Sequence, residues 1–287
     1  SAAVWLPWLL MAVRHLAVHR SWLGVAGVAA TVWFMTTAGH QQTLLYGLTV
    51  AAAWWLFWVM VGRGVLAADA WVGTAAVRDA LRRTPVRWWL ADIGRAALAL
   101  GLGLALAAPV LLPSLELADR SVRAGGLSYE DAAAFSVEPI ALIHFVLPKV
   151  FGSGPTDFWG PFSSGEIWGY VGIATLVLAA LALVIRPRPA VVLIAGLGGV
   201  ALLYALGPWL PVHGWAYRFA PLYDVIRAPA RAYLVLDLAL ALLAGLGLQT
   251  VTHRQPDARV TYVLRTTIRA LTIALAAIVL VALPLFY

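Results

Sequence analysis

Long apolar stretches separated by short polar ones dominate the chain. The alternating strands of about ten residues that a transmembrane barrel requires are not seen. Instead, runs close to the roughly 20 residues that cross the hydrocarbon layer recur along the sequence. This pattern predicts an all-α, polytopic transmembrane helical bundle with about eight spans. The predicted spans cover residues 2–18, 21–36, 42–62, 88–112, 167–185, 190–207, 229–249 and 267–286.

Two segments between the spans have a different character. Residues 68–83 mix apolar and charged positions and predict an amphipathic helix on the membrane surface. The longest connection, residues 113–166, joins the fourth and fifth spans and predicts an external loop with a functional role. Within it, residues 140–152 are apolar but too short to span, which indicates an interfacial or re-entrant piece.

Arginine is distributed unevenly between alternate loops. Most of it falls in loops near residues 14–20, 63–87, 186–189 and 250–266, so the positive-inside rule places these loops in the cytoplasm. The opposite, external set holds Arg120, Arg123, Lys149, Arg218, Arg227 and Arg231.

Composition supports the membrane interpretation. The 287-residue chain is 62% hydrophobic and 11% charged, and its 14 tryptophans suit aromatic belts at the lipid–water boundary. The net charge of +7 comes from arginines in short loops rather than from a basic tail, so no nucleic-acid partner is expected. Cysteine is absent, which excludes disulfides and thiolate chemistry. Because the chain starts at Ser1 inside an apolar region, we expect residues 1–287 to be one transmembrane domain from a longer protein.

Arg227 and Arg231 are the strongest candidates for binding a ligand. Pro229 suits the first turn of a helix, which would place Arg231 where the helix dipole is already positive. If the turn is helical, the two arginines share a face and form a cradle for a phosphate. The alternatives are contact with lipid headgroups and pairing with Asp224.

Polar residues on the external side supply further candidates. His40 and Gln41, with Gln42, form a predicted hairpin between the second and third spans, suited either to binding hydroxyl groups or to capping the turn. Glu116 shares a helical face with Arg120 and Arg123, either as a base or in a structural ion pair. Glu166 opens a predicted helix, where a carboxylate favours the dipole and could also face a ligand.

Charged and small residues also lie inside the predicted spans. Asp92, Arg95 and Asp237 are intramembrane ionisable residues, which suggest either a transport path or a buried ion pair. Closely spaced glycines predict close helix packing. The histidines have no metal-ligand spacing, so no metal site or other cofactor is evident, although a divalent metal is not excluded. The glycines are Gly101, Gly103, Gly196, Gly198, Gly199, Gly245 and Gly247.

Four stretches occur in order along the chain: FMTTAGHQQTLLYG, LLPSLELADRSVRAGGLSYEDAAAFSVEPIALIHFVLPKVFG, GEIWGYVGIATLVLAALAL and YDVIRAPARAYLVLDLALALLAGLGL. In this order they resemble the motifs of the YfhO-like family of bacterial membrane proteins. Together they cover most of residues 20–250. The resemblance implies a multi-pass protein of the bacterial cytoplasmic (inner) membrane.

This family is similar to GT-C glycosyltransferases, which take a sugar from a polyprenyl-phosphate donor at the outer membrane face. The resemblance implies that Arg227 and Arg231 contact the donor phosphate, while Glu116, His40 and Glu166 line the sugar or acceptor side. Such enzymes place their key acid in the first external loop, where this chain has only His40, Gln41 and Gln42. Two alternatives therefore stay open: a non-catalytic subunit that packs against other membrane subunits, and a transporter or flippase for a lipid-linked substrate.

Overall fold

The computed structural model describes residues 1–120, 125–152, 157–160, 169–185 and 187–252, together with positions 261–262, 265–266, 269 and 273. Every regular element in these ranges is helical, which confirms the predicted all-α class. The α-helices are α1 (Leu6–His19), α2 (Trp22–Thr37), α3 (Gln41–Gly62), α4 (Thr74–Arg83), α5 (Val86–Leu106), α6 (Ala108–Asp119), α7 (Tyr129–Ala133), α8 (Ile173–Ile185), α9 (Pro189–Ala205), α10 (Pro211–Phe219) and α11 (Tyr233–Thr252). Short 3-10 helices are η1 (Ala2–Trp5), η2 (Pro139–Phe145), η3 (Gly207–Trp209) and η4 (Pro229–Ala232).

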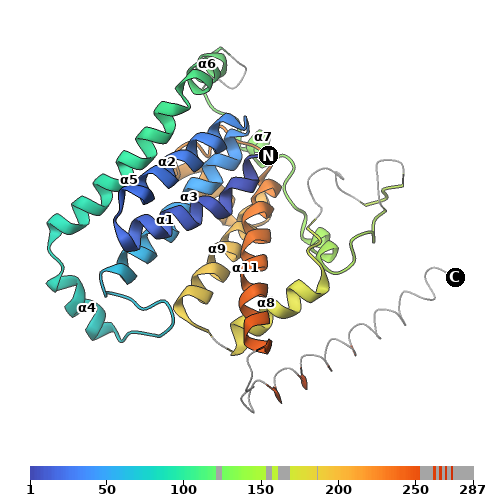
Figure 1. Ribbon diagram of the computed structural model, residues 1–287. Helices are drawn as coiled ribbons and strands as arrows, with labels where there is room; N and C mark the ends of the chain where they lie inside the picture. The colour runs from blue at the N-terminus through green and yellow to red at the C-terminus, as the bar shows by residue number, and fades with distance from the viewer. Residues whose placement is uncertain are drawn as a thin grey trace.

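The helices pack in two groups that meet along α3 (Figure 1). In the first group, α1 packs against α2 and α3, and α5 covers the outer side of α2. In the second group, α11 packs against α8 and α9. One continuous apolar core runs through both groups. This core joins the two groups.

Four helical segments are long and apolar enough to cross a membrane: Ala2–His19, Gln41–Gly62, Val86–Leu106 and Pro229–Thr252. Four shorter apolar helices accompany them: Trp22–Thr37, Ala108–Ala118, Ile173–Ile185 and Pro189–Ala205. These segments define a membrane protein built from transmembrane helices. The last predicted span, 267–286, lies almost wholly outside the described residues.

The fourth predicted span, 88–112, is interrupted in the structure. Helix α5 ends at Leu106 and α6 begins at Ala108, with Ala107 between them. Pro109 explains the break, because its ring has no N–H to donate and collides with the carbonyl one turn earlier. Helix α6 then continues to Asp119, so the first part of the predicted external loop is helical.

The remainder of that loop contains two short helices. Helix α7 begins after Ser128, whose hydroxyl accepts a hydrogen bond from the Asp131 amide at 3.1 Å. The first part of the apolar piece predicted at 140–152 lies in the 3-10 helix η2, where His144 and Ala141 are fully buried. One side of the segment packs into the protein, while Ile140, Ile143 and Val146 are exposed.

The amphipathic segment predicted at 68–83 is helical only from Thr74 onward. Helix α4 has no buried residue, and it projects from the bundle (Figure 1). The preceding residues are tied to the connection before α9: the Trp71 indole donates to the Pro187 carbonyl at 2.7 Å, and the Ala190 amide donates to the Ala68 carbonyl at 3.2 Å. Two connections far apart in sequence therefore meet at one end of the bundle.

The predicted close packing of helices at glycine is confirmed. In each of the three predicted glycine sets, one glycine lies against a neighbouring helix. A Cβ on Gly103 would lie 2.8 Å from the Ala29 carbonyl oxygen of α2, and one on Gly198 would lie 2.7 Å from Ala239 Cβ of α11. A Cβ on Gly247 would overlap the Leu178 carbonyl oxygen of α8. The other glycines of these sets face open space: Gly101, Gly196, Gly199 and Gly245.

Candidate functional site

Arg227 and Arg231 lie on either side of a sharp backbone turn. Ala228 between them has left-handed backbone angles (φ 60°, ψ 70°), which separate Arg227 from the helical turn that begins at Pro229. The expected helical i, i+4 relation between the two arginines therefore does not hold. Arg231 lies in η4, directly before α11, while Arg227 stays in the exposed connection.

The buried side chain of Gln42 holds this turn against the start of α3. Its Nε2 donates to the Arg227 carbonyl at 2.6 Å and to the Tyr46 hydroxyl at 2.8 Å, with the Ala228 carbonyl at 3.3 Å. Its Oε1 accepts a hydrogen bond of 3.1 Å from the Arg231 guanidinium. One amide thus fixes the position of the backbone at Arg227 and of the side chain at Arg231.

The Arg227 guanidinium itself lies over an aromatic ring. Its central carbon is 5.6 Å from the centroid of the Phe135 ring, and both side chains are exposed. The two segments are also joined through the backbone, because the Ala228 amide donates to the Ala134 carbonyl at 3.1 Å. A cation in this place is free to meet an anionic ligand from outside the bundle.

An apolar cavity of about 510 Å³ lies below this layer of polar groups. Its walls come from α3, α9, α10 and the start of α11, and include Tyr46, which bonds Gln42, and Ala232, which follows Arg231. Val200 on the α9 wall is 58% exposed. Since Val200 lies on an apolar helix, the cavity opens sideways toward the lipid that would surround the bundle.

Three tyrosines line this cavity. Tyr46, Tyr204 and Tyr223 have ring centroids 5.6–6.2 Å apart, a range in which aromatic rings attract one another through their edges and faces. The Tyr223 and Thr49 hydroxyls lie 3.0 Å apart. Burial raises the pKa of the Tyr223 hydroxyl, so it stays protonated and available as a donor.

The other candidate residues lie elsewhere. His40 is exposed and caps α3, with its Nδ1 accepting from the Thr43 amide at 3.3 Å, and Gln41 is exposed beside it. Glu116 and Arg120 form an exposed ion pair of 2.7 Å on α6, which packs against α2 and α5. Arg123 and Glu166 lie outside the described residues.

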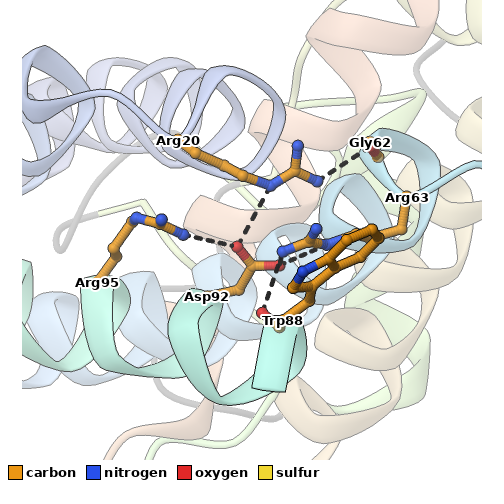
Figure 2. A network of polar contacts seen from close by, with 6 residues as sticks. All are labelled: Arg20, Gly62, Arg63, Trp88, Asp92 and Arg95. Atoms are coloured by element: carbon orange, nitrogen blue, oxygen red, sulfur yellow. Dashed lines mark hydrogen bonds and ion pairs between the residues drawn. The ribbon is translucent and has the colours of Figure 1, made fainter. Parts of the chain in front are cut away.

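Within the first helix group, Asp92 is the centre of a second polar cluster (Figure 2). Its carboxylate is 3% exposed and faces three arginines: Arg20 and Arg63 at the C-terminal ends of α1 and α3, and Arg95 one turn further along α5. Arg63 donates to Oδ2 from Nη2 at 2.7 Å and from Nε at 2.9 Å, and Arg95 donates to Oδ1 at 3.1 Å. The Arg20 Nε lies 3.4 Å from Oδ1, while its Nη2 donates to the Gly62 carbonyl at 2.9 Å.

The cluster accounts for two of the three intramembrane charges seen in the sequence. Arg95 contacts Asp92 as the i, i+3 spacing suggests, and it makes no ion pair with Asp237. Within the part of the chain that the structure describes, Asp237 forms no salt bridge, and no group of three His, Cys, Asp or Glu side chains is arranged to hold a metal.

Gln42, Tyr46, Tyr204 and Tyr223 complete the site but were not predicted as its binding residues. The i, i+4 spacing of Gln42 and Tyr46 is a usable signal, because it places both on one face of a helix. Tyr204 and Tyr223 carry no such signal, since their approach to Tyr46 depends on how α9 and the following connection pack against α3.

Replacing Gln42 with alanine is expected to lower the free energy of unfolding by about 1–3 kcal/mol, because buried carbonyl groups would lose their donor. Thermal unfolding of the purified protein in detergent measures the change. Gln41→Ala is the matched control. The Gln41 side chain is exposed, so its removal should not change the unfolding temperature measurably. Similar losses in both variants would show that Gln42 does not hold the turn.

Comparisons with models of protein families, with curated proteins and with solved structures find no match for this chain. The class of the protein therefore rests on its own helices, which define an all-helical membrane protein. The resemblance to YfhO-like proteins stays a prediction.

Proposed function

We propose that the protein binds a polyprenyl-phosphate-linked sugar, with the phosphate at Arg227 and Arg231 and the start of the isoprenoid chain in the adjacent cavity. The observation that carries the proposal is the position of that cavity. Its apolar lining begins at Ala232 and Tyr46, next to the residues that hold both arginines. A ligand with an anionic head and an apolar tail matches this arrangement.

The size and position of the two parts support this ligand class. A volume of about 510 Å³ accommodates a substantial apolar group, and small-molecule sites commonly measure about 300–1,000 Å³. Arg231 precedes the first turn of α11, where the helix dipole is positive and an anion is stabilised. The sideways opening at Val200 would let a long chain continue into lipid.

Transfer of the sugar is the reaction that this ligand suggests. An acceptor hydroxyl oxygen would form a bond to the sugar's anomeric carbon as the bond from that carbon to the phosphate oxygen breaks. A carboxylate would take the hydroxyl proton, and the arginines would stabilise the charge on the departing lipid phosphate. Glu116 and Glu166 are the candidates for this carboxylate base, because the resemblance places them on the sugar or acceptor side.

A second candidate function is that of a non-catalytic lipid-binding subunit. The specific observation in its favour is Glu116, which is 65% exposed and paired with Arg120 on α6 rather than turned toward Gln42 or Arg231. A lipid-linked sugar would still bind in this case, but other membrane subunits would supply the reacting groups.

We further propose eight spans in the bacterial inner membrane, with the arginine-rich loops in the cytoplasm. Contacts between the loops support the alternation. At one end of the bundle, Arg20 in the first of these loops contacts Gly62 at the end of α3 and Asp92 in α5. At the other end, the Val137 amide donates to the Ala205 carbonyl, so segments proposed as external also come together.

The binding proposal predicts that Arg227→Ala and Arg231→Ala each weaken binding of a short isoprenyl phosphate by about tenfold, as expected for one lost charge-assisted hydrogen bond. The affinity is measured by titrating the short isoprenyl phosphate into the detergent-solubilised protein and quantifying the bound species by native mass spectrometry. Arg218→Ala is the control, because Arg218 lies nearby in α10 and contacts Phe219 instead. Unchanged affinity in both test variants would refute the phosphate site, whereas binding without turnover of a sugar-carrying donor would favour the non-catalytic subunit.

A further inference from the structure

The polar cluster around Asp92 carries more positive charge than it needs for pairing. Three guanidinium groups share a single carboxylate, which leaves an excess of two positive charges. Within the described ranges, these three arginines form no ion pair with another acid. Two of the three are accessible: the Arg95 side chain is 37% exposed and that of Arg20 is 25% exposed. The cluster is therefore suited to hold an additional anion.

An apolar cavity of about 290 Å³ begins next to this cluster and runs along the first helix group. Leu16 lines it on α1, four residues before Arg20, and Ala96 lines it on α5, four residues after Asp92. Asp92 and Ala96 share a face of α5, and Arg20 directly follows the last residue of α1, so the cavity begins beside the cluster. The cavity continues along α5 to Leu100, away from the charged end.

The surface beside this cavity is suited to lipid. Ile93 and Ala97 line the cavity and are exposed, and Leu90, Leu98 and Leu102 on the same helix are also exposed apolar side chains. Arg95 thus emerges from an apolar surface at the level of the cluster. In this setting, an anion with an attached hydrocarbon chain satisfies both the charge and the cavity.

We infer that the Asp92 cluster and the adjoining cavity bind one anionic phospholipid. Its phosphate would lie at Arg20 and Arg95, and one acyl chain would lie in the cavity between α1, α3 and α5. This site is at the opposite end of the bundle from Arg227 and Arg231, and it does not depend on the function proposed for them. A free phosphate would satisfy the charge but leave the cavity unfilled.

The test compares phosphatidylglycerol with phosphatidylcholine of the same chains, titrated into the full chain in detergent and followed by native mass spectrometry. We expect phosphatidylglycerol to bind preferentially and Arg95→Gln to weaken its binding by about tenfold. Arg83→Gln is the matched control, because Arg83 is an exposed arginine on α4 outside the cluster. Its phosphatidylglycerol affinity should equal that of the unmodified protein.

A second variant examines the cavity without changing the charges. Ala97→Phe places a ring in the cavity, so it should weaken phosphatidylglycerol binding while leaving the cluster intact. Soluble glycerol phosphate should bind far more weakly than the lipid. Equal binding of the two lipids, or equal losses in Arg95→Gln and Arg83→Gln, would overturn the inference. Strong binding of glycerol phosphate together with an unaffected Ala97→Phe variant would also overturn it, and would indicate a site for free phosphate.

Discussion

Replacing Asp92 with asparagine is expected to lower the free energy of unfolding by about 3–5 kcal/mol, the cost of removing one partner from a buried ion pair. The carboxylate is 3% exposed and is the only acid that pairs with Arg20, Arg63 and Arg95 in the described part of the chain. Without its charge, three guanidinium groups would converge on a neutral amide and repel one another (Figure 2). Thermal unfolding in a neutral detergent measures the loss.

The exposed ion pair on α6 provides the control for this prediction. Glu116→Gln also removes one carboxylate charge next to an arginine, but the Glu116 side chain is 65% exposed and that of Arg120 is 76% exposed. Solvent screening makes such pairs nearly neutral for stability. We therefore expect no measurable shift for Glu116→Gln. If the two variants melt at the same temperature, the Asp92 cluster does not stabilise the fold.

The second large effect is expected from Gly247→Ala at the contact between α11 and α8. A Cβ at this position would overlap the Leu178 carbonyl oxygen, which belongs to the backbone and cannot move aside as a flexible side chain does. The two helices would have to separate, at a cost of about 1–3 kcal/mol for an overpacked interior.

Gly245→Ala is a close control for that substitution. Gly245 lies in the same helix two residues earlier, and a Cβ there meets nothing within 4 Å. Alanine favours a helix over glycine by up to about 1 kcal/mol, so this variant should be as stable as the original protein or more stable. Unfolding temperatures of the two variants measured side by side give the result. A stable Gly247→Ala protein would mean that α8 and α11 do not approach this closely.

The arrangement of helices could be predicted from sequence where it depends on local patterns. The apolar runs locate the helices, and the glycines within them indicate close packing, although of Gly245 and Gly247 only Gly247 lies at a helix contact. The break after Leu106 was missed although Pro109 signals it, because the apolar run continues unbroken through both helices. Hydrophobicity alone does not show that proline lacks the backbone N–H that a continuous helix needs.

Contacts between distant segments could not be predicted in the same way. The i, i+3 spacing indicates the pairing of Asp92 with Arg95, but nothing local indicates that Arg20 and Arg63 also reach this carboxylate. At the other end, Gln42 was seen only as part of a polar hairpin. Its role becomes visible once η4, about 185 residues later, is placed against α3.

Hydrogen bonds join the two helix groups at both ends of the bundle, and any movement of one group against the other affects them. Gln42 on α3 is bonded to the turn before α11 at one end, and Trp71 and Ala68 are bonded to the segment around α9 at the other. Alternating access requires one group of helices to rock against the other around a central site. Such rocking would open one set of these hydrogen bonds in each half of the cycle. A transport cycle of this kind would therefore have to break and re-form the hydrogen bonds that join the two helix groups.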